Sequence, residues 1–164
     1  MKRRFGTILT RLAWGGTTLT ELERIIIEAL IANLPEWLGQ TVNLQFEAYN
    51  LVQREHDGRS LNFYRKLNGR SNNMNGLPLL DMNCEEAQLV GVTFRLTNVD
   101  AQVNATMTAT RGRVFYVSFD RSLRTINSIG PLAAERVRHS WRTNFREPRA
   151  QNNPIDRSGG SAAS

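Results

Sequence analysis

The sequence is poor in the residues that build redox, metal and cofactor sites. Among its 164 residues Cys84 is the one cysteine, so no intramolecular disulfide and no cysteine-based zinc site can form. This usage is typical of a reducing compartment. The glycines are scattered, and none lies in the strand–Gly-x-Gly-x-x-Gly–helix setting that cradles phosphate. We therefore expect no metal and no cofactor.

Long apolar runs are missing as well. No stretch of about 18 apolar residues occurs, so we expect no membrane-spanning helix. Residues 1–16 are basic, but Thr7, Thr10 and Arg11 interrupt the apolar stretch that a secretory signal needs. As a helix this segment would be amphipathic, which fits docking on the domain, contact with a membrane surface or import into an organelle. We expect a cytoplasmic protein, with organelle import as the alternative.

Both ends of the chain are basic, and the formal net charge is +6. Residues 1–20 contain four basic residues and no acid, and residues 132–164 contain six arginines against three acids. Because the middle is nearly neutral, contacts with phosphate or an acidic partner should come from the two ends. The candidate contact residues are Lys2, Arg3, Arg4, Arg11, Arg138, Arg142, Arg146 and Arg149.

A first helix is predicted between Thr20 and Leu34. Thr20 and Glu23 match a capping box, and Pro35 ends the helical pattern. Leucines and isoleucines cover most of the helix circumference, so the helix must be buried on more than one side. The sheet can cover one side, and the other needs a C-terminal helix, a second subunit or another protein.

Alternating apolar residues predict a meander of five antiparallel strands. The strands are expected near residues 41–55, 60–67, 88–97, 101–110 and 113–120. Asp57-Gly58 predicts a two-residue type I′ hairpin that sets Val52 opposite Phe63 and Ala48 opposite Leu67.

The later hairpins are predicted in the same way. A four-residue loop sets Leu96 opposite Ala101 and Phe94 opposite Val103. We then expect a three-residue loop ending at Gly112, which pairs Met107 with Phe115 and Ala105 with Val117 and keeps one continuous apolar face.

A basic amphipathic helix is predicted near residues 131–147, and the tail 148–164 is expected to be disordered. The fold class is therefore α+β, with one N-terminal helix on a five-stranded sheet and residues 17–147 as a single domain. This layout is similar to that of cystatin-like and NTF2-like sheets. If the sheet curls in that manner, Phe94, Met107 and Phe115 would line an apolar pocket for a small ligand.

No set of residues predicts an enzyme. His56 falls at a hairpin tip, and His139 falls on the predicted basic helix. Cys84 precedes Glu85-Glu86, whose charges work against a reactive thiolate. We therefore expect a protein without catalytic activity.

Three functions remain open. The first is a protein–protein interaction module, such as an adaptor, an inhibitor or immunity-type protein or an assembly subunit, which binds another protein or its own copies through the amphipathic ends and the over-apolar helix. The second is nucleic-acid binding by the basic ends. The third is a small-ligand pocket protein or an enzyme of unfamiliar type.

Overall fold

The computed structural model describes residues 19–67, 70–71, 76–96, 101–126, 132–139 and 141–147. The predicted basic extension 1–16, with Lys2, Arg3, Arg4 and Arg11, lies outside these residues, as does the whole predicted tail 148–164 with Arg149.

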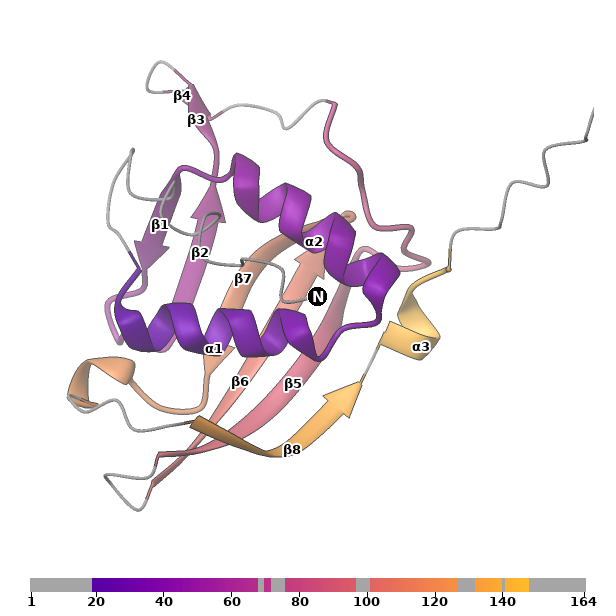
Figure 1. The fold of residues 1–164 in the computed structure, drawn as a ribbon. Helices are drawn as coiled ribbons and strands as arrows, with labels where there is room; N and C mark the ends of the chain where they lie inside the picture. The colour runs from indigo at the N-terminus through magenta and orange to yellow at the C-terminus, as the bar shows by residue number, and fades with distance from the viewer. Residues whose placement is uncertain are drawn as a thin grey trace, which may run out of the picture.

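The fold is α+β, with two helices on an open antiparallel sheet of six strands. The helices are α1 (Glu21–Ala32) and α2 (Glu36–Ala48), and both lie on one face of the sheet (Figure 1). The sheet order is β1-β2-β7-β6-β5-β8. Its strands are β1 (Leu51–Arg54), β2 (Ser60–Tyr64), β5 (Glu86–Leu96), β6 (Ala101–Thr110), β7 (Arg113–Phe119) and β8 (Leu132–His139).

Three short elements complete the described chain. A small hairpin joins β3 (Lys66–Leu67) to β4 (Arg70–Ser71), a 3-10 turn η3 covers Leu123–Thr125, and a single helical turn α3 covers Trp141–Asn144. Phe145 then forms an isolated bridge to Met82.

The capping box that begins α1 is confirmed. The backbone N–H of Glu23 donates to the Thr20 hydroxyl at 3.3 Å, and the Glu23 carboxylate accepts from the Thr20 N–H at 2.6 Å. The apolar residues of α1 are covered on the sides where the helix meets the sheet and α2; Leu22, Ile26, Ile27, Leu30 and Ile31 are all buried. The second cover that this helix needs is thus supplied largely from within the chain.

The prediction of a long strand over residues 41–55 is wrong, because most of this segment forms α2. Leu38, Val42 and Phe46 recur every four residues, and this spacing places all three in the core with at most 1% of their surface exposed. Leu44 belongs to the apparent alternation but is 46% exposed. The expected pairing of Ala48 with Leu67 therefore does not occur.

The hairpin at Asp57-Gly58 has the predicted register, with Val52 opposite Phe63. Its turn type differs from the prediction, because Gly58 has φ of 70° whereas Asp57 is not in the positive-φ region. A type I′ turn needs positive φ at both central residues.

The β6–β7 hairpin differs from the prediction. Arg111 and Gly112 have φ of 50° and 78°, so these two residues make the tight turn, and Thr110 faces Arg113. The register then shifts by one residue within β7, so that Met107 faces Val117. The expected three-residue loop and the expected pairing of Met107 with Phe115 are therefore wrong, because the extra residue of this hairpin lies in β7 as a β-bulge.

That shift also changes the second expected pair of this hairpin, since Ala105 faces Phe119 rather than Val117. The β5–β6 register is confirmed, with Leu96 opposite Ala101 and Phe94 opposite Val103.

The predicted basic helix over residues 131–147 is also wrong. Residues 132–139 form β8, which pairs with β5 along its open edge and sets Val137 opposite Val92. The helical pattern survives only in α3, from Trp141 to Asn144, and in the burial of Phe145. Pairing with β5 satisfies the backbone groups along the open edge of β5 and packs the partly buried Val137 against the core.

Candidate functional site

The face of the sheet opposite α1 and α2 carries polar side chains. Successive residues of a strand point to opposite faces, so Val92 and Phe94 enter the core while Thr93 and Arg95 point away from the helices. We call this side the helix-free face. Along β5, β6 and β7 its side chains are mostly half-buried or exposed, in contrast to the closed core on the other side.

A row of small residues crosses this face. The strand registers place Ser118 opposite Thr106, Thr106 opposite Gly91 and Gly91 opposite Arg138, on β7, β6, β5 and β8 in turn. We call these four residues the cross-strand row. Since neighbouring strands lie about 4.8 Å apart, the row spans about 14 Å.

The row is hollowed at Gly91. A side chain there would place its Cβ 3.6 Å from Thr106 Oγ1 and 3.9 Å from Arg138 Cβ, so the missing side chain leaves a dip between them. The dip has a volume of about 50 Å³ and is rimmed by Gln88, Thr93, Asn104, Thr106 and Arg138. We call it the Gly91 hollow. Its polar rim offers hydroxyl, amide and guanidinium groups to a ligand.

Hydrogen bonds hold one side of this hollow. The Thr93 hydroxyl donates to Asn104 Oδ1 at 2.5 Å, and Asn104 Nδ2 donates to Asp120 Oδ2 at 2.6 Å. The Asn104 backbone N–H also donates to Asp120 Oδ1 at 3.0 Å. The chain Thr93–Asn104–Asp120 therefore has a defined orientation before any ligand arrives.

An aromatic cluster lies on the same face, beside the row. The ring centroids of Tyr64 and Phe115 are 5.6 Å apart, those of Phe115 and Tyr116 are 6.2 Å apart, and both pairs meet edge to face. The β7 bulge explains this gathering, because the extra residue takes Phe115 out of the core alternation. Phe115 is 39% exposed, which is unusual for a phenylalanine in a central strand.

Charge differs between the two layers. The segment 19–50, which contains α1 and α2, has five acidic residues and only Arg24 as a base. The helix-free face instead carries Arg95, Arg136 and Arg138, all of which are exposed. An anion is thus favoured at the sheet and disfavoured at the helices.

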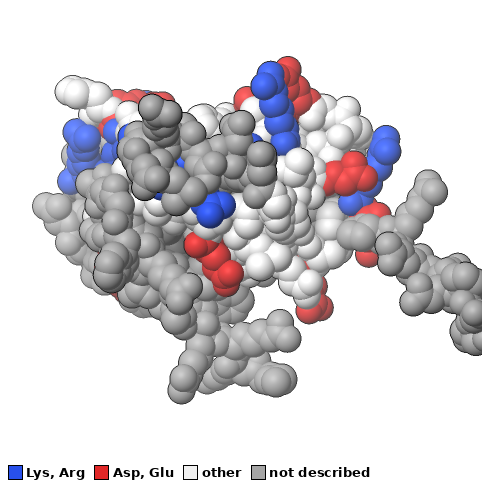
Figure 2. All heavy atoms as spheres, turned by 90° about the horizontal axis from the view of Figure 1, so that it is seen from above, with Lys and Arg blue, Asp and Glu red and all other residues white. Residues whose placement is uncertain are grey.

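The acids described on the helix-free face are engaged by neighbouring groups. Glu86 accepts a hydrogen bond from the Tyr116 hydroxyl at 3.2 Å, and Asp120 is held by Asn104. From above, the described surface shows basic and acidic side chains interspersed, without a patch of one sign (Figure 2).

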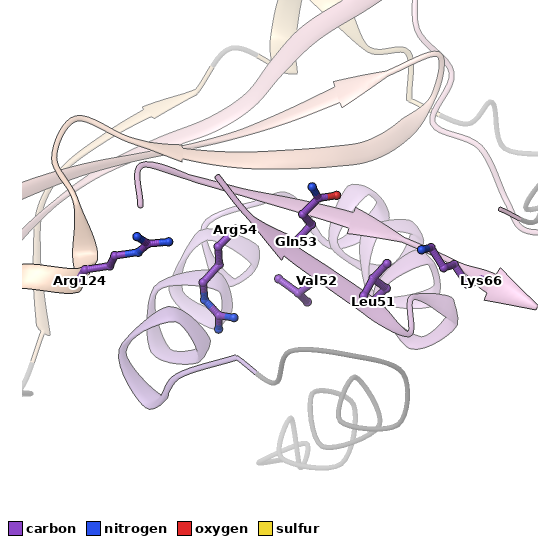
Figure 3. A pocket seen from close by; sticks show the side chains of 6 residues that line it. All are labelled: Leu51, Val52, Gln53, Arg54, Lys66 and Arg124. Atoms are coloured by element: carbon purple, nitrogen blue, oxygen red, sulfur yellow. The ribbon is translucent and has the colours of Figure 1, made fainter. Parts of the chain in front are cut away.

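A larger open groove of about 470 Å³ runs along β1. It is lined by Leu51, Val52, Gln53, Arg54, Lys66 and Arg124 (Figure 3). Arg54 turns toward α1, where its Nε and Nη2 donate to the Glu23 carboxylate at 2.7 and 2.6 Å. Hydrogen bonding to Glu23 raises the pKa of the Arg54 guanidinium, and Arg124 donates to the Glu55 carbonyl at 3.4 Å. Two of the three cations of this groove are therefore committed to the protein itself.

The predicted phosphate contacts are dispersed among different elements. Arg138 lies on β8 at the end of the cross-strand row, Arg142 lies on α3, and Arg146 follows it. Arg142 stacks on the adjacent Trp141 ring at 5.5 Å. They do not form the predicted single helical stripe.

The predicted apolar pocket residues are placed on opposite sides of the sheet. Phe94 and Met107 are buried in the core, whereas Phe115 belongs to the aromatic cluster on the helix-free face. The structure does not bring the three together.

The remaining chemistry-bearing residues lie apart from one another. His56 is exposed in the β1–β2 turn, His139 is exposed at the end of β8, and Cys84 is exposed before β5. Within the described ranges there is no cluster of three or more potential metal ligands, and no helix long and apolar enough to cross a membrane.

Sequence reasoning missed Arg95, Arg136, Tyr64 and Tyr116 as members of a surface. One signal was available: Gly91 interrupts an apolar strand pattern, and such a glycine often marks close approach of a ligand or another backbone.

No protein-family model matches the chain, and the searches of curated proteins and of solved structures give no significant match.

Proposed function

We propose that this protein binds nucleic acid through the helix-free face of its sheet. The observation that carries the proposal is a difference in charge between the layers: three exposed arginines, Arg95, Arg136 and Arg138, lie on the polar face, whereas the helix segment 19–50 has five acidic residues and one basic residue. A phosphate backbone gains most from such a surface, because each contact releases a condensed counterion. The proposal includes a cytoplasmic location.

The alternative of a protein partner has less support. It depended on α1 being too apolar for a single chain, but the apolar residues of α1 pack largely against the sheet and α2. Ile25 is half-buried, and the apolar area that it exposes is too small to indicate an interface. Docking through the two ends of the chain remains a prediction. The small-ligand alternative would need Phe94, Met107 and Phe115 in one pocket.

Salt dependence tests the proposal. Binding of a labelled single-stranded oligonucleotide should weaken steeply with salt, with a slope that reports the number of neutralised phosphates. The double variant Arg136→Gln/Arg138→Gln should lower the affinity and reduce the slope by about 1.4, or about 0.7 for each contact.

The matched control is Arg142→Gln/Arg146→Gln, which removes the same charge from exposed residues outside the face. It should keep most of the slope. Equal losses in the two double variants would show that binding follows net charge and would contradict a site on the sheet. Absence of any salt-sensitive binding would rule out the function.

A further inference from the structure

Resting on the proposed function, we propose that the ligand is single-stranded, with one base stacked on Phe115 and the backbone crossing the sheet along the cross-strand row to Arg138. Duplex binding through the same arginines is the competing outcome.

The first step is the state of the Phe115 ring. Tyr64 and Tyr116 meet it at interplanar angles of 87° and 89°, so neither ring is stacked parallel to Phe115. The ring is 39% exposed and is the one aromatic among the exposed large apolar residues of the described chain. An exposed aromatic ring without a parallel-stacked neighbour in this cluster is suited to stacking on a base.

The second step is the backbone that positions this ring. Without the bulge, Phe115 would alternate into the core beside Val117, as the sequence suggests. The bulge keeps Val114 and Val117 buried and moves Phe115 to the other side. Bulges are frequent next to functional sites, where they redirect a side chain.

The third step is the path away from the ring. The cross-strand row offers the hydroxyls of Ser118 and Thr106, then the Gly91 hollow, then the guanidinium of Arg138. Ser60 continues the row beyond Ser118 but is buried, so the open path runs toward β8. Small polar residues between an aromatic ring and an arginine leave room for sugar and phosphate groups close to the sheet.

The fourth step distinguishes single strands from duplexes. A base can stack on a protein ring only if its face is available, and in a duplex both faces are already stacked. The arginines would attract either form, whereas Phe115 would contribute only to binding of a single strand. The aromatic cluster therefore indicates the single-stranded form.

Fluorescence anisotropy tests this inference with a labelled oligothymidylate about twelve nucleotides long and with the same strand in a duplex. We expect the single strand to bind more tightly. Phe115→Ala should weaken single-strand binding about ten-fold or more, and Phe115→Trp should restore it. Gly91→Val, which fills the hollow, should also weaken it.

Leu44→Ala is the matched control, because Leu44 is comparably exposed but lies on α2. Circular dichroism of each variant checks that it is folded. If Phe115→Ala unfolds, Phe115→Trp still tests the inference, because a tryptophan at this position should keep single-strand binding tighter than duplex binding. Equal affinity for single strand and duplex, or equal effects of Phe115→Ala and Leu44→Ala, would overturn the inference. If Arg136→Gln/Arg138→Gln still lowers affinity in that case, the proposed function stands. Equal competition by polyglutamate would overturn both.

Discussion

The side-chain amide of Gln45 on α2 donates to the carbonyl oxygen of Gly112 at 2.9 Å, joining the helix layer to the β6–β7 turn. The same nitrogen donates to the Pro78 carbonyl at 2.9 Å, and the amide oxygen accepts from the Val114 N–H at 2.8 Å. β2 pairs with β7 only over Tyr116–Ser118, so Gln45 supplies the partner that β2 does not give to Val114. This fully buried side chain thus orients the segment that leads into the bulge at Phe115.

Gln45→Leu should therefore destabilise the fold. Leucine is similar in size but leaves the Val114 N–H and the Pro78 carbonyl without the bonds that Gln45 makes. Each buried unsatisfied group costs about 1–3 kcal/mol, so we expect a loss of about 2–4 kcal/mol. The measurement is the urea midpoint of unfolding at an unchanged denaturant slope.

Gln40→Leu is the control for this substitution, because Gln40 is exposed on the same helix and bonds only to the nearby Glu36 carboxylate in the described contacts. Its effect should stay within about 0.5 kcal/mol. Similar midpoints for the two variants would show that Gln45 does not anchor the turn.

The Glu23 carboxylate gives a second prediction. It accepts two bonds from Arg54 and one from the Thr20 N–H, and its side chain is only 5% exposed. Glu23→Gln should cost about 2–4 kcal/mol, since it removes the carboxylate charge that faces the partly buried Arg54 guanidinium.

Glu21→Gln is the comparison, because Glu21 pairs with Arg24 on the surface and its side chain is 54% exposed. Such pairs are worth about 0–1 kcal/mol. Thermal unfolding of both variants separates the two cases, and equal shifts in Tm would mean that the Glu23–Arg54 pair behaves as a surface pair.

Local signals predicted the parts of the fold that local chemistry decides. The Thr20–Glu23 capping box lies within four residues of sequence, and the Val52–Phe63 register follows from the short turn at Asp57-Gly58. The long β5–β6 pairing was predicted because a short loop leaves few possible registers.

Two errors arose where one pattern fits two periods. Val42 and Phe46 satisfy both an alternation of two and a spacing of four, and Leu38 on the same helical face decides for α2. For β8 a tertiary contact overrides the local helical pattern, because residues 132–139 pair with the edge of β5 and Val137 lies opposite Val92. That edge is not visible in the sequence of residues 131–147.

The candidate site was predicted only in fragments. Arg138 and Phe115 were both singled out, but Arg138 for a helical stripe and Phe115 for an apolar pocket. The sequence analysis expected one extra residue in the loop at Gly112, with Phe115 on the apolar face; in the structure the extra residue is Phe115 itself, within β7, and it leaves the core. Two features favour the bulge in the strand over a longer turn: Arg111 adopts a positive φ, and Gln45 accepts a hydrogen bond from the Val114 N–H. Neither feature can be predicted from the alternation of apolar and polar residues.

The phenol of Tyr49 leads to a prediction about alkaline pH. It is buried and donates a hydrogen bond to the Val114 carbonyl. Burial raises the pKa of this phenol well above its ordinary value of 10.0, and the positive charge of Arg113 offsets only part of the effect. Below pH 10 the phenol is neutral in the folded and unfolded chains alike, so its full contribution to stability is present there.

Above that pH the unfolded chain loses the Tyr49 proton while the folded chain keeps it, so unfolding releases a proton and stability falls as pH rises. Tyr49→Phe removes this loss but also one hydrogen bond, which costs about 1 kcal/mol at neutral pH. The variant should therefore be less stable than the wild type near pH 8. The difference in the free energy of unfolding between the two proteins should become smaller or change sign near pH 11. Urea midpoints across this range measure this difference, and parallel curves would show that Tyr49 ionises equally in both states.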